Sequence, residues 1–428
     1  MREEIYIAIV MFVIAIAGSV WKKNDMKWSV FFMFVASVAG SLTAGMGVRF
    51  REIVEGPFGL LDTALSVCTA SVFVWLMYSS GSFDMLFNSI CKIKNRTLKA
   101  FAVLLYIALP AALTGFATSS VLTTGKKVAE NLKGRNVDNK KITALVAGGA
   151  FIGMIMPPNC IPAMVAANAA GSVLPTPYVG FFLPLLITAV PSYIVYALMF
   201  RSSLSSVEGE SESDKASWQK FGLGFVFGLV IVLMLVEGLL SSYVYIGGNT
   251  LIFTLASIAV IALCKGFGSF KKALDTVSDG LETAVWPVAL MLVIGSFVEV
   301  SSMSGVRGYF SLKILPYDVP DVMLVMIAIV LVLGAFIGEA IPAFLTTYAV
   351  YPISWLANTV VVTGCAVPLA CVSLLSCRNG LIEKTAKLLG TDTKYKDVIA
   401  SMIPALVITV AIGIFWVYCG DNLSVLIL

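Results

Sequence analysis

Small and hydroxyl-bearing residues are concentrated at Ala112–Thr124, where the chain reads ALTGFATSSVLTT inside an apolar stretch. Where a membrane helix is broken, hydroxyls and freed carbonyls can replace the water shell of a cation, and helix N-termini favour an anion. The same residue types also let membrane helices pack closely. This run therefore predicts either an ion site or a tight helix contact.

A double proline interrupts a second apolar stretch, 142–171, at Met156–Asn159, which reads MPPN. Pro157 and Pro158 have no N–H group, so carbonyls one turn earlier lose their helical donors. Those carbonyls can bind Na⁺ or a substrate hydroxyl, and Asn159 offers a side-chain amide at the same depth. The alternative is a simple kink.

An acidic residue, Glu339, lies in the apolar run 321–357. A carboxylate within the membrane is costly, so it is by default a functional candidate. Glu339 could bind a cation or carry a proton. The alternative is a structural acid with a partner elsewhere in the same segment.

A guanidinium follows a third interrupted stretch, 359–390, at Arg378-Asn379. Arginine at a helix break would suit a carboxylate substrate, because its planar fork can bond both oxygens. We take Arg378 and Asn379 as candidate substrate ligands. Residues 359–377 could instead complete a span, which would put Arg378 at the cytoplasmic interface.

The composition identifies the class of protein that must position these residues. The chain has 428 residues, of which 59% are hydrophobic and 13% charged, and it contains no histidine. A soluble domain is about half apolar and a quarter charged, so the composition predicts a polytopic membrane protein.

Without histidine there is no Ser-His-Asp triad and no HExxH zinc site. No second acid accompanies Glu339, so we expect neither an enzyme nor an organic cofactor. Nucleic-acid binding has no support.

Apolar stretches long enough to span a bilayer predict an all-α protein. The uninterrupted candidates are 4–21, 28–47, 59–78, 178–200, 220–246, 249–264, 281–300 and 398–418. The interrupted stretches are 100–125, 142–171, 321–357 and 359–390. Broken backbone at membrane depth must be buried in protein or line a wet cavity.

The two halves of the chain resemble each other. Gly115–Thr124 and Gly338–Thr347 are identical at five of ten positions, and Asn159 and Asn379 follow them at similar distances. We infer an internal duplication: 1–200 is the first repeat, 201–219 a polar cytoplasmic linker and 220–428 the second repeat. Thr123 and Thr346 occupy equivalent positions, and we take both as candidate substrate ligands.

The topology follows if the interrupted segments at about 100–135 and 321–357 are re-entrant helical hairpins. Each repeat, with its broken helix at about 142–171 or 359–390, then crosses the membrane five times, so the repeats are inverted. Charge supports this, since 23 of the 29 Lys and Arg residues fall on one side and five on the other. The basic side is expected to be cytoplasmic, with both termini outside. Inverted repeats with broken helices are a recurring plan of secondary transporters.

The residues from 112 to 186 resemble the DctM-like large membrane subunit of TRAP transporters, in the ion transporter superfamily. The motifs are Thr114-Gly115 with Ser119-Ser120, then Gly148-Gly149, Gly153 and Pro157-Pro158-Asn159. An upstream match is GLLDT at 59–63, and FIGEAIPAF at 336–344 stands in the second hairpin. The likeness extends from about 50 to 418. One departure is Cys377-Arg378-Asn379-Gly380, where the family usually has Pro-Pro-x-Gly.

The resemblance implies a Na⁺-driven elevator, in which a mobile unit carries both hairpins past a rigid scaffold. One Na⁺ site would use Ser119, Ser120 and backbone near Pro157. The other would use backbone from Gly338, with Glu339, and the break near Ser376. It also implies a small membrane subunit and an extracytoplasmic substrate-binding protein as partners. The alternative is a stand-alone carrier, for example a homodimer.

The sequence therefore predicts a transporter of the bacterial cytoplasmic membrane that imports a small organic anion, such as a carboxylate, with Na⁺. The alternative is a carrier coupled to protons or working by exchange, with Glu339 as proton carrier. A channel is less favoured, because pore rings usually come from oligomer symmetry rather than from hairpins duplicated in one chain.

Overall fold

The fold is that of a computed structural model describing residues 2–21, 25–48, 50–165, 181–209, 218–239, 248–263, 270–314, 316–317, 319–337, 359–377 and 379–427. All regular elements in these ranges are helices, which confirms the all-α prediction. Seven of the described helices are long and apolar enough to cross a membrane. The chain is therefore a multi-pass membrane protein.

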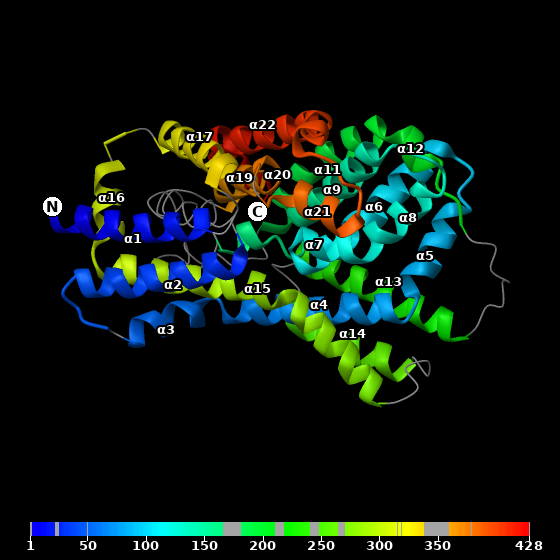
Figure 1. The fold of residues 1–428 in the computed structure, drawn as a ribbon, viewed down its shortest axis with the longest axis horizontal. Coiled ribbons are helices and arrows are strands. Elements are labelled where there is room, and N and C mark those ends of the chain that lie inside the picture. The colour runs from blue at the N-terminus through cyan, green and yellow to red at the C-terminus, as the bar shows by residue number, and fades with distance from the viewer. Residues whose placement is uncertain are drawn as a thin grey trace.

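The first half of the chain supplies eleven labelled α-helices and one π-helical turn up to residue 205 (Figure 1). Their bounds are α1 Arg2–Val20, α2 Met26–Thr43, α3 Phe50–Gly59, α4 Leu61–Ser79, α5 Ser82–Cys91, α6 Arg96–Thr114, α7 Ala117–Ser120, η2 Val121–Gly125, α8 Lys126–Lys133, α9 Asn139–Ile155, α11 Phe182–Met199 and α12 Arg201–Ser205. In Figure 1, α1, α2 and α3 lie towards the left-hand end, while α5, α8 and α12 lie towards the right-hand end.

The second half contains the longest helices. Their bounds are α13 Trp218–Leu239, α14 Gly248–Leu263, α15 Phe270–Met303, α16 Val306–Ile314, α17 Val319–Ile337, α19 Thr359–Ala370, α20 Val372–Leu375, α21 Leu381–Leu389 and α22 Tyr395–Ile427. The span expected at 281–300 is part of the 34-residue α15. Its first ten residues are largely exposed and polar, so they extend the helix beyond the apolar span rather than forming a loop.

Two antiparallel arms form a helical hairpin from α6 to α8. Asn95 caps the first arm, where its side chain accepts hydrogen bonds from the amides of Thr97 and Leu98. Gly115 ends that arm with φ 81°, a left-handed conformation that favours glycine. The return arm bonds back to the first: Ser120 Oγ accepts from the amide of Ala111 at 2.8 Å. Both ends of this hairpin therefore lie at the same end of the molecule.

The described interior is divided into two main hydrophobic clusters. The larger one contains buried residues of α4–α9, α11, α13, α14, α19, α21 and α22. The smaller one contains buried residues of α1, α2, α3, α15 and α16, with Val165, Val330 and Val372. We call the border between the two clusters the seam and the parts on either side the two bodies; α4, α17 and α20 contribute buried residues to both clusters and therefore cross the seam.

Basic segments that are far apart in sequence meet at one end of the molecule. Lys127 pairs with Asp84 at 3.3 Å, and Arg135 pairs with Glu208. The hydrogen bond from Arg135 and its positive charge lower the pKa of the Glu208 carboxyl. The first residues of the linker expected at 201–219 therefore pack against the protein, and Leu204 and Val207 are also buried.

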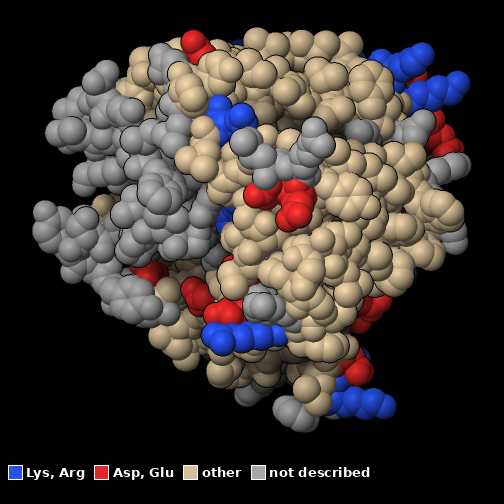
Figure 2. Space-filling view, turned by 90° about the vertical axis from the view of Figure 1, so that its left-hand side faces the viewer, with Lys and Arg blue, Asp and Glu red and all other residues tan. Residues whose placement is uncertain are grey.

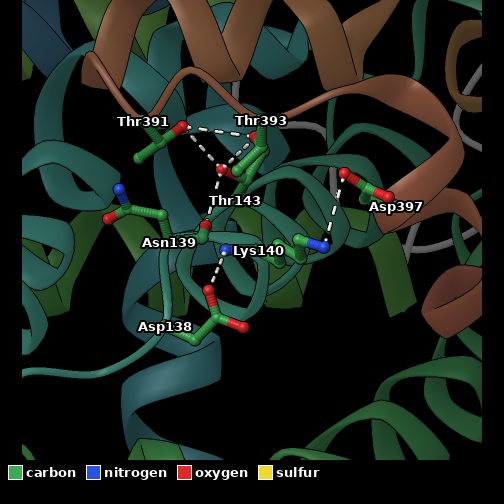
Figure 3. A network of polar contacts seen from close by, with 7 residues as sticks. All are labelled: Asp138, Asn139, Lys140, Thr143, Thr391, Thr393 and Asp397. Carbon is green, nitrogen blue, oxygen red and sulfur yellow. Dashed lines mark hydrogen bonds and ion pairs between the residues drawn. The ribbon is translucent and has the colours of Figure 1, made fainter.

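A network of hydroxyls joins the first broken helix to the connection between α21 and α22 (Figure 3). Thr143 Oγ1 lies 2.7 Å from Thr391 Oγ1, and Thr393 Oγ1 donates to Thr143 Oγ1 at 2.9 Å. Nearby, Lys140 Nζ lies 3.5 Å from Asp397 Oδ2. Residues of the two predicted repeats are thus joined directly between α9 and the α21–α22 connection.

Figure 2 views the molecule from the end where α1, α2, α3 and α16 lie. Wide areas of this face carry no charged residue, and the charged residues gather in small separate groups. Large exposed apolar residues on α1, α2 and α3 include Ile9, Phe31 and Phe58. In Figure 1 these three helices run along the long axis of the molecule, so their exposed apolar sides suit contact with lipid.

Glycines bring α3 and α15 into direct backbone contact. A Cβ added at Gly295 would lie 2.6 Å from the carbonyl oxygen of Gly56. One added at Gly56 would lie 2.2 Å from the carbonyl oxygen of Gly295. Backbone atoms cannot move aside as a flexible side chain can, so both positions require glycine.

We predict that Gly295→Ala lowers the free energy of unfolding by about 1–3 kcal/mol, because the added methyl overpacks the contact with Gly56. Thermal unfolding of the purified protein in detergent measures the change. Gly228→Ala on α13 is the control, because a Cβ there meets nothing within 4 Å. Equal thermal midpoints for the two variants would contradict this packing.

Candidate functional site

Hydroxyl and carbonyl oxygens converge at the tip of the α6–α8 hairpin. Thr114 Oγ1 and Ser119 Oγ lie 2.6 Å apart, and Ser119 Oγ also donates to the carbonyl of Phe116 at 2.8 Å. Both hydroxyl side chains are buried. Several oxygens on one side of a buried tip are the kind of ligand set that a hard cation can use.

Ser120 and Thr123 face other parts of the hairpin. Ser120 Oγ accepts from the amide of Ala111, so it joins the two arms. Thr123 Oγ1 donates to the carbonyl of Ser119 at 2.7 Å, one turn earlier. In this structure the expected substrate ligand Thr123 is therefore bonded to its own helix. The π-helical turn η2, of a kind frequent at functional sites, begins directly after Ser120.

The first broken helix ends its first part at Ile155, and a new helical segment begins at Ile161. Asn159 lies in the break and is fully buried. Its side-chain amide donates to the carbonyl of Leu113 at 2.6 Å, and its own backbone amide donates to the carbonyl of Ala112 at 3.3 Å. Asn159 thus satisfies the carbonyl end of α6.

The carbonyl of the Asn159 side chain collects two further donors. Ser66 Oγ on α4 donates to Asn159 Oδ1 at 3.2 Å, and Asn249 Nδ2 on α14 donates to it at 3.0 Å. A Cβ at Gly115 would lie 2.3 Å from the Asn159 backbone oxygen. Four separate segments therefore meet at this asparagine, and Gly115 permits the close approach.

The second broken helix is interrupted between Leu375 and Leu381. Ser376 is buried there, and the amide of Cys377 donates to the carbonyl of Ala335 on α17 at 3.1 Å. Asn379 adopts φ 52°, and its amide donates to Glu383 Oε2 at 2.8 Å. The break at Ser376–Asn379 expected from the sequence is present, and its backbone is turned sharply at Asn379.

Four of the predicted site residues lie outside the described residues: Gly338, Glu339, Thr346 and Arg378. Their assignments stay predictions. The described ligand candidates of the first half, Ser119, Ser120 and Pro157, belong to segments that meet around Asn159.

A cavity of about 160 Å³ lies where the two hydrophobic clusters face each other. It brings together the hairpin tip, both broken helices, the start of α2 and the middle of α15. Its described lining consists of Met26, Gly115, Phe116, Ala117, Thr118, Met154, Ile161, Pro162, Val165, Pro287, Leu290, Met291, Ile294, Ala370, Val372, Ser373, Leu381 and Lys384. Lys384 is the charged side chain in that described lining.

Sequence reasoning missed three residues of this region. Lys384 lies on α21 but contributes to the cavity, whereas its basic neighbours suggested a cytoplasmic position. Ser66 and Asn249 reach Asn159 from helices that read as ordinary spans. A polar residue in a helix can signal such a contact, but its partner 93 residues away is not visible in the sequence.

Comparison with known proteins gives a family match over most of this region. Residues 96–362 match the family described as "Tripartite ATP-independent periplasmic transporter, DctM component". A candidate TRAP transporter large permease protein of Haemophilus influenzae is 23% identical over 245 residues, which cover 55% of this chain. The chain spans 58% of the length of that curated relative.

Solved transporter structures share the fold. The YdaH transporter of Alcanivorax borkumensis superposes with a TM-score of 0.59 at 13% identity, covering 85% of this chain and 87% of that one. Neisseria gonorrhoeae MtrF, described within a class of antimetabolite efflux pumps, gives 0.57 at 12% identity, covering 91% and 94%. At these identities the likeness concerns the fold alone.

We predict that Asn159→Ala destabilises the protein by more than either Ser66→Ala or Asn249→Ala. Each of the latter removes one hydrogen bond, worth about 1 kcal/mol, whereas Asn159→Ala also leaves the buried carbonyl of Leu113 without that donor. Thermal unfolding in detergent gives the order. If Asn159→Ala were the mildest of the three, Asn159 would not be the centre of this contact.

Proposed function

The chain belongs to the DctM component family of tripartite ATP-independent periplasmic transporters, and from that premise we propose that it is a secondary active transporter importing a small organic anion with Na⁺. The proposal extends to an elevator movement, in which one body carries the substrate past the other.

The cavity at the seam is the observation that carries the proposal. It is bounded by the hairpin tip and both broken helices on one side, and by α2 and α15 on the other. A solute held there would contact both bodies at once. A sliding movement of one body against the other would then change which side of the membrane the solute can reach.

The two bodies have the separate cores that such a movement needs. Buried side chains of α6, α7, α9 and α21 belong to the larger cluster, and those of α1, α2 and most of α15 belong to the smaller one. Displacement along the seam would leave most buried contacts within each body intact. The hydroxyl network of Thr143, Thr391 and Thr393 would keep the first broken helix and the α21–α22 connection moving together.

Lys384 supplies the charge that an organic anion requires. An ammonium in a described lining that is otherwise uncharged and mostly apolar offers up to three donors to a carboxylate. Low polarity around this contact strengthens it relative to water. We therefore add Lys384 to Asn159, Asn379, Thr123, Thr346 and Arg378 as candidate substrate ligands.

The hairpin tip, at which we propose the first Na⁺ site, lines this cavity through Gly115–Thr118. The first would use Ser119, Ser120 and backbone near Pro157, and the convergence of Thr114 and Ser119 oxygens at the tip supports it. The second would use Gly338, Glu339 and Ser376, of which Ser376 is buried in the second break. Binding of Na⁺ at either site would favour an anion nearby, because opposite charges offset each other's desolvation.

Partners and location belong to the same proposal. The family description names a tripartite system, so we propose a small membrane subunit and an extracytoplasmic binding protein as partners. The membrane would be the bacterial cytoplasmic membrane, with both termini outside and the basic end inside. Proton coupling or exchange through Glu339 is the second candidate function.

Uptake by proteoliposomes tests the function. The purified chain would be assayed alone and with its partner subunits for organic acids, with an inward Na⁺ gradient and then with K⁺ in its place. Uptake that requires Na⁺ supports the proposal. Uptake that follows a pH gradient without Na⁺ supports the alternative, and no uptake under any condition would remove both.

We predict that the double change Ser119→Ala with Ser120→Ala raises the Na⁺ concentration for half-maximal uptake about tenfold or more. This corresponds to the loss of at least about 1.4 kcal/mol of cation binding. Ser71→Ala is the control, because Ser71 is a buried serine that donates to its own helix at the carbonyl of Val67. An unchanged Na⁺ dependence would place the cation elsewhere.

We predict that Lys384→Gln raises the substrate concentration for half-maximal uptake about tenfold or more, since a charge-assisted contact contributes roughly 1.5–3 kcal/mol. Lys387→Gln is the control, because Lys387 is exposed one turn further along α21. Equal effects of the two substitutions would show that Lys384 does not contact the anion.

A further inference from the structure

Glu237 is an acidic residue within a candidate membrane span, and the proposed Na⁺ sites do not use it. Glu237 is the third residue from the end of α13 and only 5% exposed. Its Oε1 accepts from the amide of Gly248 at 3.0 Å, whereas Oε2 is buried and has no hydrogen-bond partner among the residues that the structure describes. A carboxylate in this position is costly unless a proton or another cation neutralises it.

The helices packed around Glu237 bring no compensating charge. α14 contains no charged residue, and neither does α11, whose Phe182 lies against Gly238. The two tyrosines of α11 donate elsewhere, to the carbonyls of Phe101 and Ala144. Neither of these two helices therefore offers Glu237 a charged partner.

The remaining charges on neighbouring helices lie away from this end of α13. Asp84 of α5 pairs with Lys127, and α5 meets α13 through Phe83 and Phe227, nearly three turns before Glu237. The other charged residue of α13, Lys220, lies at the opposite end of the helix. On α4, which packs against α14, Asp62 is exposed.

The first turn of α14 holds one oxygen of the carboxyl. Gly248 is the first residue of α14, so the carboxyl lies at a helix N-terminus and accepts one of its unpaired amides through Oε1. Oε2 is buried and has no hydrogen-bond partner among the described residues, which leaves it as the oxygen that a proton can occupy.

A short path connects Glu237 to the candidate site. The residue after Gly248 is Asn249, whose Nδ2 donates to Asn159 Oδ1 in the first helix break at 3.0 Å. The first turn of α14 therefore contacts the carboxyl through Gly248 and the break through Asn249. A change in the charge of Glu237 alters how firmly this turn is held.

We propose that Glu237 is a proton-binding site coupled to the first helix break, in addition to the Na⁺ sites. The carboxylate takes one proton from the aqueous phase and becomes a carboxylic acid, which weakens its bond to Gly248 and frees Asn249 to shift on Asn159. Loss of the proton to water restores the carboxylate and the bond. This inference rests on the proposed transport function.

A proton suits the site better than a metal ion does. Na⁺ and similar hard cations take several oxygen ligands, whereas the described residues around Glu237 offer one carboxylate among apolar side chains. Among the residues that the structure describes, no group of three or more acidic, cysteine or histidine side chains forms an ion site.

Uptake at saturating Na⁺ as a function of pH provides the first test. In the wild type, the uptake rate should change by up to about tenfold per pH unit on one flank of its pH profile, as expected when one protonation is essential. Glu237→Gln should vary by less than about twofold over the same range and keep its Na⁺ requirement. Glu130→Gln, which changes an exposed glutamate on α8, should behave as the wild type. The same pH profile in wild type and Glu237→Gln overturns the proposal.

Infrared difference spectra of the purified protein provide a second test that needs no transport. A pH step should change a carboxylic acid C=O band that is lost in Glu237→Gln and kept in Glu130→Gln. Glu237→Asp should shift this band rather than remove it, which keeps the test decisive if the glutamine variant does not fold. Absence of such a band overturns the proposal. If no variant transports under any gradient, the proposed function fails, while the spectra still decide whether Glu237 binds a proton.

Discussion

The structure depends on the need to satisfy the polar backbone of broken helices without water. α6 ends inside the protein, α9 ends next to it, and lipid can bond neither set of exposed carbonyls and amides. Asn159 resolves most of this problem, since it donates to the carbonyls of Ala112 and Leu113 and accepts from Ser66 and Asn249. The arrangement needs a glycine at 115, because any Cβ there would collide with the Asn159 carbonyl.

The same constraint explains why the polar groups gather beside the seam. Helix ends that are buried in protein must lie where several helices converge, and here they converge at the border of two hydrophobic clusters. The cavity at that border combines apolar walls with hydroxyls, helix ends and one lysine in its described lining. A ligand site between two bodies couples binding to their relative position, since binding energy depends on contacts made to both.

The packing of the helices explains why several positions in the sequence are glycine. Gly56 and Gly295 allow the backbones of α3 and α15 to touch, and Gly364 and Gly413 do the same for α19 and α22. Within a membrane the hydrophobic effect does not drive helices together, because lipid tails are as apolar as the side chains. Close backbone packing of this kind contributes to helix association instead. Gly153 likewise approaches the carbonyl of Ala108, which fixes the broken helix against the hairpin.

The sequence by itself determined the class of protein, the helical content, the family resemblance and the places where helices break. These properties depend on local composition, because apolar length sets the spans and two consecutive prolines break a helix. A single proline does not suffice, since Pro110, Pro287 and Pro404 lie inside helices. The break at 156–160 was therefore visible from its double proline, whereas the break near Ser376 was expected from the internal repeat and the family resemblance.

Only the tertiary structure decided which side chains meet at those breaks. Ser66, Asn249 and Lys384 stand in segments that read as a span or a basic flank, and their role comes from neighbours far away in the chain. Thr123 donates to the carbonyl of Ser119 one turn earlier, a bond that a threonine can make in any helix, so its expected role as a substrate ligand stays a prediction. Glu237 likewise gains its significance from the amide of Gly248 and from uncharged neighbours. Such relations arise from how helices rotate and pack, which a one-dimensional pattern does not encode.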